Sequence, residues 1–200
     1  MTTVVIPFAG AEGKTRLHAS RRIRRALAHA MFCDVLAACL QVGRTRVVTP
    51  DEEGAEAARD AGAEVVADPG GGQGPAVQAG LAGVGLGGIL VVNADVPCVV
   101  PHDLRSLLAT PAGCLALVEA LDGTTNALSL PSAGAFAPLY GPSSSDRFRA
   151  HGASLGLEVV SVSVPNLADD VDTLEDLTRL QLRAGPRTQA CLVELERSAV

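Results

Sequence analysis

The fold is decided by the stretch GILVVNADVPCV at residues 88–99. It begins with a short apolar run, which is typical of a strand buried at the centre of a sheet. Pro97 stops the chain from continuing as strand, so Asp95 lies just beyond the strand's carboxyl end. Ligands of open α/β sheets bind at that edge. A carboxylate there suits a hard cation such as Mg²⁺; the alternative is an Asp that caps a turn or a helix.

On both sides of this stretch, β-branched runs alternate with Ala- and Leu-rich runs. The alternation predicts an α/β fold with a mainly parallel sheet. The 200 residues fit one domain, 1–200, in which 184–200 form a tail of uncertain structure. The predicted strands are 3–6, 46–49, 64–67, 88–92, 114–118, 126–130 and 158–162. The predicted helices lie near 20–40, 52–61, 74–82, 101–109, 144–156 and 173–183.

The composition excludes several classes of protein. Hydrophobic residues are 48% of the chain, but the apolar runs are far shorter than the roughly 18 residues of a membrane span. The net charge of −6 argues against nucleic-acid binding, which normally needs a basic surplus. The five cysteines form no Cys-x-x-Cys pair, which fits reduced thiols. With no export signal, we expect a cytoplasmic protein that binds neither nucleic acid nor membrane; a homodimer is left open.

The sequence Gly-Lys-Thr at residues 13–15 raises the question of a P-loop. That loop needs a glycine five residues before Gly13, where this chain has Phe8, so we reject it. The stretch is still interpreted as a phosphate-binding loop, of a type other than the P-loop. The alternative is an ordinary surface loop. Lys14 is the only lysine of the chain, and its compact ammonium group suits phosphate. The candidates in this loop are Gly10, Gly13, Lys14, Thr15 and Arg16.

A second acidic stretch, DDVDTLEDL, occupies residues 169–177. It follows the predicted strand 158–162, which ends at the same edge of the sheet as the strand before Asp95. Asp170 and Asp172 stand on alternate extended positions, so their carboxylates point the same way. They would complete a magnesium site with Asp95. The alternative is a capping box before a helix, formed by Asp172 with Glu175 or by Thr173 with Asp176.

Two further loops are rich in small polar residues: GTTNAL at 123–128 and YGPSSSDRFRAHGA at 140–153. The second leads into a predicted helix, whose N-terminus could bind a phosphate. Taken alone, both loops are better explained as polar turns, the second with an N-cap serine.

Together these motifs resemble the guanylyltransferases of coenzyme F420 biosynthesis, which activate 2-phospho-L-lactate or phosphoenolpyruvate with GTP. The resemblance runs from residue 4 to about residue 180. It implies a nucleotidyltransferase of the GT-A type, a three-layer α/β/α Rossmann-like sandwich. The motifs that carry it are KTRL at 14–17, ADVP at 94–97, GTTNAL at 123–128, YGPSS at 140–144 followed by His151, and DVDTLEDL at 170–177.

The resemblance also implies roles for particular residues. The implied catalytic residues are Lys14, Arg16 and Asp95. The implied nucleotide-binding residues are Gly10, Gly13, Lys14, Gln73 and Gly74. The implied ligands of Mg²⁺ are Asp95, Asp170 and Asp172, and the acceptor phosphate would lie on Thr125, Gly141 and Ser144. This chain departs from the family at Gln73, Gly74 and Pro75, where members tend to have Gly-Leu-Asn, although Gln73 could still meet a guanine edge.

The implied reaction joins GMP from GTP to the phosphate of a small carboxylic acid and releases pyrophosphate. No protein nucleophile is needed, because a phosphate is already ionised at neutral pH; catalysis is positioning and charge neutralisation. In the family that this chain resembles, archaeal members are associated with 2-phospho-L-lactate and bacterial members with phosphoenolpyruvate. The composition, rich in Ala, Arg and Gly and poor in Lys, favours a bacterial source, so the resemblance implies phosphoenolpyruvate over 2-phospho-L-lactate or 3-phosphoglycerate. The alternatives are a molybdenum-cofactor or sugar-phosphate nucleotidyltransferase of the same fold, and a non-catalytic nucleotide-binding protein.

Overall fold

A computed structural model describes residues 1–10 and 19–198. Within these ranges the chain forms a seven-stranded sheet in the order β3-β2-β1-β4-β6-β5-β7. Only β6 runs antiparallel to its neighbours, β4 and β5, so the described sheet is mainly parallel, as predicted. The strands are β1 (Thr3–Pro7), β2 (Arg44–Thr49), β3 (Glu64–Ala67), β4 (Ile89–Val92), β5 (Leu115–Glu119), β6 (Thr125–Leu130) and β7 (Val159–Ser161).

The apolar run that was predicted to be the central strand is β4. It lies fourth among the seven strands of the described sheet, between β1 and β6. Each of its four residues is at most 1% exposed. β4 is therefore covered on both faces. The residues that follow its carboxyl end, Asn93 to Asp95, lie at the edge of the sheet.

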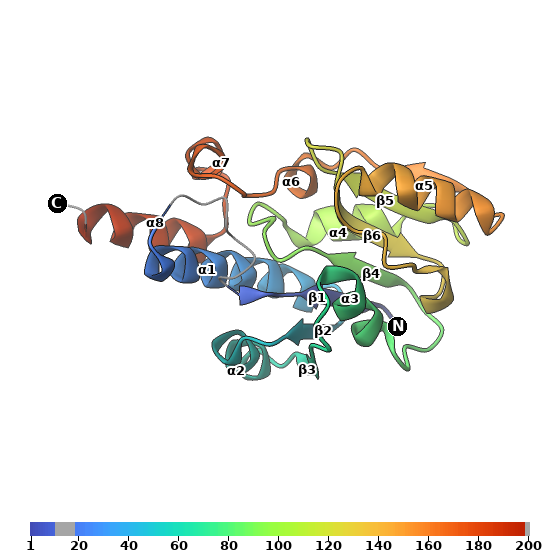
Figure 1. Cartoon of the computed structure of the whole chain (residues 1–200), viewed down its shortest axis with the longest axis horizontal. Helices are drawn as coiled ribbons and strands as arrows, with labels where there is room; N and C mark the ends of the chain where they lie inside the picture. Colours follow the sequence, from blue (N-terminus) through green and yellow to red (C-terminus); the bar gives the residue numbers. More distant parts are fainter. Residues whose placement is uncertain (11–18, 199–200) are drawn as a thin grey trace.

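Helices cover both faces of the sheet (Figure 1). On one face α1, α2, α4 and α6 pack on the side chains of Val4, Ile6, Leu90 and Val92. On the other face α3 and α5 pack on Val5, Ile89, Val91 and Leu128. The three-layer α/β/α arrangement is therefore confirmed. The helices are α1 (Arg21–Leu40), α2 (Glu52–Asp60), α3 (Gln73–Leu81), α4 (Pro101–Leu108), α5 (Ser144–Ser154), α6 (Pro165–Ala168), α7 (Leu174–Leu180) and α8 (Pro186–Ser198).

Helix starts follow the local sequence signals closely. Ser20 caps α1, because its hydroxyl accepts from the Ile23 amide. Thr173 caps α7 in a capping box with Asp176, so the second of the two predicted boxes is the one that forms. α7 ends at Leu180, three residues before the predicted end.

All five cysteines are free thiols.

The tail that could not be assigned from sequence ends in a helix, α8, which lies along α1 (Figure 1). A buried carboxylate on α1 caps it across more than 150 positions of the chain: Asp34, 6% exposed, accepts hydrogen bonds from the amides of Arg187 and Thr188 at 3.1 and 2.8 Å and from the Thr188 hydroxyl at 2.7 Å. Gly185 leaves room for this carboxylate, since a Cβ there would lie 2.3 Å from the Asp34 Cγ.

Asp34→Ala is expected to lower the free energy of unfolding by about 3 kcal/mol, because it leaves buried donors at the start of α8 without an acceptor. Urea unfolding measures the change. Glu56→Ala, on the exposed face of α2, is the control and should change stability by less than about 0.5 kcal/mol. Equal values for the two variants would mean that the Asp34 cap adds nothing to the attachment of α8.

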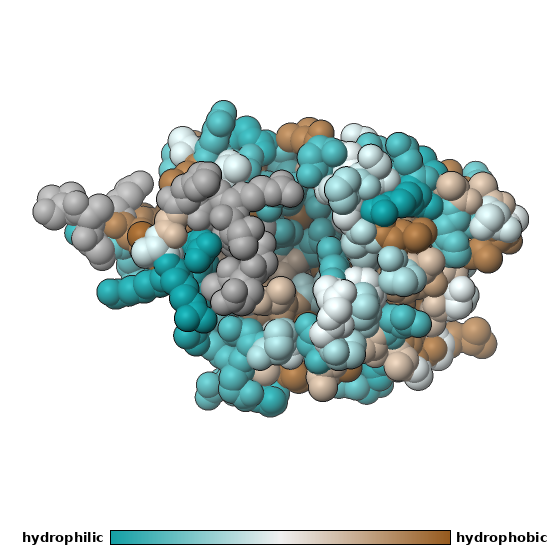
Figure 2. All heavy atoms as spheres, viewed as in Figure 1, coloured by the Kyte–Doolittle hydropathy of each residue, from teal (hydrophilic) through white to brown (hydrophobic). Residues whose placement is uncertain are grey.

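Several large apolar side chains of the described residues are exposed, among them Leu86, Leu121 and Leu182. The face drawn in Figure 2 is mostly hydrophilic, and its apolar side chains lie in small separate groups. No helix in the described part of the chain combines the length and the apolar character needed to cross a bilayer.

Candidate functional site

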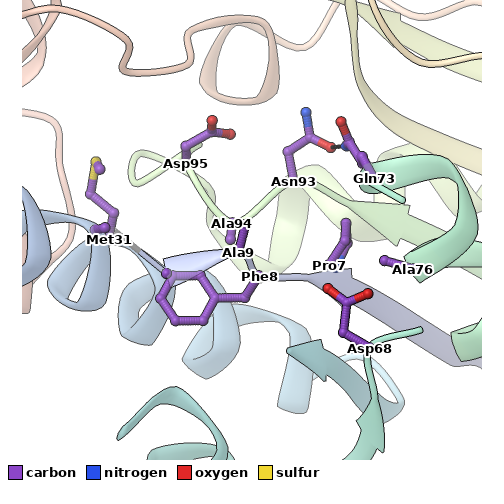
Figure 3. Close-up of a pocket in the computed structure, with 13 residues that line it drawn as sticks. Pro7, Phe8, Ala9, Met31, Asp68, Gln73, Ala76, Asn93, Ala94 and Asp95 are labelled. Carbon is purple, nitrogen blue, oxygen red and sulfur yellow. Dashed lines mark hydrogen bonds between the residues drawn. The ribbon is translucent and has the colours of Figure 1, made fainter. Parts of the chain in front are cut away.

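A pocket opens at the carboxyl ends of β1 and β4, between α1 and the start of α3 (Figure 3). It lies at the sheet edge where α/β folds bind ligands. Its walls are largely apolar, with polar groups contributed by Asp68, Gln73, Asn93 and Asp95. The lining residues are Pro7, Phe8, Ala9, Gly10, Ala28, Met31, Asp68, Gly72, Gln73, Ala76, Asn93, Ala94 and Asp95.

Beside this pocket, the three predicted acidic residues come together. Asp95 follows β4, and Asp170 and Asp172 precede α7, yet one carboxylate oxygen from each lies within 4.8 Å of the others. The Val171 amide donates to the Asp95 carbonyl at 3.0 Å, which joins the two segments. Val171 itself is fully buried. Because side chains alternate along an extended chain, burying Val171 turns its neighbours Asp170 and Asp172 toward Asp95.

The electrostatics of this acidic site favour a bound cation. Burial, the largest cause, and the charges of Asp95 and Asp172 raise the pKa of Asp170, and a hydrogen bond from Asn126 lowers it; together they bring this pKa to about 6. The raised pKa means that a negative charge on Asp170 is costly beside its neighbours. A cation would remove that cost, and carboxylate oxygens are ligands of hard cations. The residues therefore fit a metal ion.

Asp176, and not Asp172, provides the carboxylate of the capping box before α7. Its carboxylate accepts from the Thr173 hydroxyl at 2.8 Å and from the amides of Thr173 and Asp172 at 2.9 and 3.2 Å. Since Thr173 and Asp176 form the box, the carboxylate of Asp172 is not needed for it. Asp95 does not cap α4 either, because the N-cap of that helix is Val100.

Asp169, which precedes the acidic site in the sequence, forms ion pairs with two arginines. Its carboxylate accepts from Arg179 at 2.6 Å and from Arg183 at 2.9 Å. Burial alone would raise the pKa of Asp169, but the hydrogen bonds and charges of the two guanidinium groups outweigh it and lower that pKa. Asp169 is thus an ionised anchor for α7, adjacent in sequence to Asp170.

A chain of side-chain amides connects the pocket with the acidic site. Gln73 Nε2 donates to Asn93 Oδ1 at 2.6 Å (Figure 3). Asn93 Nδ2 donates to Asn126 Oδ1 at 3.2 Å, and Asn126 Nδ2 donates to Asp170 Oδ1 at 3.2 Å. Asn93 and Asn126 were not predicted as site residues. Their positions gave a signal, because each stands at the end of a strand that borders the site, but asparagine is common at strand ends.

The predicted acceptor residues Thr125, Gly141 and Ser144 also lie together, where α5 begins beside β6. The Ser144 hydroxyl donates to Thr125 Oγ1 at 3.2 Å, and the Ser144 amide donates to the Gly141 carbonyl at 3.0 Å. Thr125 and Ser144 are at most 1% exposed, whereas Gly141 is exposed and has a φ of 111°. The cluster meets the pocket through Asn93, whose Nδ2 donates to the Thr125 carbonyl at 3.2 Å.

The predicted nucleotide-binding residues divide into three groups. Gly10 and Gln73 line the pocket. Gly74 does not; a Cβ there would lie 2.6 Å from the Pro138 Cβ, so close packing accounts for this glycine. Gly13, Lys14, Thr15 and Arg16 lie outside the described residues, and their roles stay predictions.

Gly10 and Phe8 show how the first loop begins. Gly10 has a φ of 63°, and a Cβ there would lie 2.8 Å from the Asp51 Oδ2, so both backbone and space favour glycine. Phe8 is 5% exposed, and its ring stacks on Phe32 with a centroid distance of 4.3 Å. Phe8 is a core residue, where a P-loop would need glycine.

The sequence is similar to known nucleotidyltransferases. Residues 8–178 match the MobA-like NTP transferase domain. The chain is 35% identical to a phosphoenolpyruvate guanylyltransferase of Nocardia farcinica over an alignment of 194 positions, which covers 90% of this chain and 83% of that protein. It is 36% identical to one of Streptomyces coelicolor over an alignment of 207 positions, which covers 96% of each chain.

A solved structure bears on the fold. A nucleotidyl transferase from Methanothermobacter superimposes with a TM-score of 0.68 at 21% identity, covering 90% of this chain and 95% of that one. At this identity the likeness shows the fold alone. The predicted nucleotidyltransferase fold is confirmed.

Proposed function

The chain belongs to the MobA-like NTP transferases and, among them, to the phosphoenolpyruvate guanylyltransferase family, and from this premise we propose its reaction. The protein transfers GMP from GTP to the phosphate of phosphoenolpyruvate and releases pyrophosphate. This reaction serves coenzyme F420 biosynthesis. The observation that carries the proposal is the near full-length identity of about 35% with two relatives of that name. The acidic site beside a pocket at the sheet edge supports it.

The chain's own residues bind and orient the reactants. GTP occupies the pocket, with its phosphates toward Gly10 and Asp95. Gly13, Lys14 and Arg16, which lie outside the described residues, would bind these phosphates. A Mg²⁺ ion held by Asp95, Asp170 and Asp172 would supply charge neutralisation for the triphosphate and for the leaving pyrophosphate. An oxygen of the acceptor phosphate attacks the α-phosphorus, so the protein forms no covalent bond with the substrate.

The acceptor phosphate lies in our proposal against Thr125, Gly141 and Ser144. Support comes from the contact between Asn93 and the Thr125 carbonyl, which keeps this cluster next to the nucleotide pocket. Two anionic substrates that meet at one site repel each other, so fixing both is a large part of catalysis. The free cysteines fit the reducing cytoplasm, and a homodimer stays a prediction.

The experiment incubates the protein and Mg²⁺ with GTP, ATP or CTP, each with phosphoenolpyruvate, 2-phospho-L-lactate, 3-phosphoglycerate or no acceptor, and measures pyrophosphate. We expect release only with GTP and an acceptor, fastest with phosphoenolpyruvate. Release with CTP or ATP, or only with sugar phosphates in an added arm, would assign the protein to another branch of the fold. Orthophosphate without an acceptor would indicate a nucleotide hydrolase instead.

A further inference from the structure

The amide chain between the pocket and the acidic site has a fixed direction. Asn126 is 1% exposed, and its Nδ2 faces two groups that can only accept hydrogen bonds: the Asp170 carboxylate at 3.2 Å and the Ala168 carbonyl at 3.4 Å. Turning the amide over would set its oxygen against both acceptors. The orientation of Asn126 is therefore determined by its neighbours, and Oδ1 faces Asn93.

The same argument applies to the next member of the chain. Asn93 Nδ2 faces the Asn126 Oδ1 and the Thr125 carbonyl, both at 3.2 Å, and both only accept. Asn93 Oδ1 must then face Gln73, which donates its Nε2 at 2.6 Å. Each asparagine uses both N–H groups of its amide. What Gln73 can offer to a ligand in the pocket is consequently its carbonyl oxygen, Oε1, together with the second N–H of Nε2.

We propose that Asn126 and Asn93 are positioning residues that join the acidic site to the nucleotide pocket. Asn126 holds the Asp170 carboxylate in its place in the metal site. Through Asn93, the same hydrogen bonds leave Gln73 Oε1 as an acceptor for an N–H of guanine. Guanine presents two adjacent N–H donors, N1 and N2, to such an acceptor, whereas adenine presents one donor, the N6 amino group, beside an acceptor at N1. This inference rests on the proposed function, because that function makes GTP the nucleotide.

The test measures metal and nucleotide binding separately, without turnover. The affinity for Mn²⁺ is followed by electron paramagnetic resonance. The ratio of the dissociation constants of ATP and GTP is followed by displacement of a fluorescent GTP analogue. The variants are Asn126→Ala and Asn93→Ala. The matched control is Gln189→Ala, since the side-chain amide of Gln189, on α8, donates to the carbonyls of Leu182 and Ala184 in the turn before that helix.

Asn126→Ala should weaken Mn²⁺ binding about tenfold, as loss of a group that orients a metal ligand does. It should also lower the preference for GTP over ATP by about five- to tenfold, the value of one hydrogen bond. Asn93→Ala should lower the preference alike and leave Mn²⁺ affinity unchanged, because Asn126 still holds Asp170. Gln189→Ala should change neither. Thermal unfolding of each variant verifies that it is folded.

An Asn126→Ala protein with wild-type affinity for Mn²⁺, or an Asn93→Ala protein with wild-type preference for GTP, would overturn the inference. If Asn126→Ala does not fold, Asn93→Ala, at a half-buried position, still decides the nucleotide part, and Asn126→Ser decides the metal part. A wild-type protein that binds GTP and Mn²⁺ but releases no pyrophosphate with any acceptor would refute the proposed function and leave this test valid.

Discussion

Asp95→Asn should lower turnover by about 100- to 1,000-fold while the protein keeps its fold, because the change removes a charge that is needed only where the triphosphate reacts. Asp95 lies at the open carboxyl end of β4, within 4.8 Å of Asp170 and Asp172. Asparagine keeps the shape of the side chain and fills the same space. Pyrophosphate release with GTP and phosphoenolpyruvate measures the effect, and circular dichroism verifies the fold.

Asp60→Asn, at the exposed end of α2, is the matched control, since it removes the same charge far from the pocket. Turnover of this variant should equal that of the wild type. Near-normal turnover of Asp95→Asn would show that Asp95 only shapes the turn after β4, and the metal site in our account would be wrong.

Asp170→Asn should separate activity from stability. Turnover should fall as for Asp95→Asn, but the metal-free protein should become more stable near neutral pH. The reason is the raised pKa of Asp170, about 6 in the folded protein, against about 3.9 in an unfolded chain. Between these values the folded state binds more protons than the unfolded state, so stability falls as pH rises from about 4 through about 6. Asparagine carries no charge at any pH and avoids this loss.

Urea unfolding of wild type and Asp170→Asn in a chelator, across the range from about pH 4 to about pH 7, tests this prediction. The advantage of the variant should be absent at the acid end and grow as pH passes the pKa of Asp170. Added Mn²⁺ or Mg²⁺ should reverse the order, because only the wild type gains stability from the ion. A variant that is less stable at every pH without metal would contradict the strained, like-charged site that we describe.

The sequence predicted the parts of this protein that depend on neighbouring residues. Of the predicted strand 88–92, residues 89–92 are buried as β4, and the alternation of Asp170 and Asp172 around a buried Val171 directs both carboxylates to one side. These are properties of a few adjacent positions, with a period of two along an extended chain. The joining of Asp170 and Asp172 with Asp95 followed from the rule that parallel strands end at one edge of the sheet.

The parts that escaped prediction depend on residues far apart in the chain. The N-terminus of α8 is capped by Asp34, which is more than 150 positions away. In the sequence, Asn93 and Asn126 are two asparagines at strand ends with no visible relation. The antiparallel pairing of β4 with β6 brings them side by side. The close packing of Gly74 on Pro138 is likewise a contact that the sequence does not reveal, and nucleotide binding by Gly74 stays a prediction.

Phosphorus NMR of the wild-type reaction with GTP, phosphoenolpyruvate and Mg²⁺ tests the central claim most directly. Our account predicts that pyrophosphate appears together with an equal amount of a new asymmetric diphosphate, whose phosphorus signals are coupled to each other and which contains both guanosine and enolpyruvate. Asp95→Asn should give neither signal. GDP and orthophosphate in place of these products, or a diphosphate that forms equally well without phosphoenolpyruvate, would contradict the transfer of GMP to this acceptor.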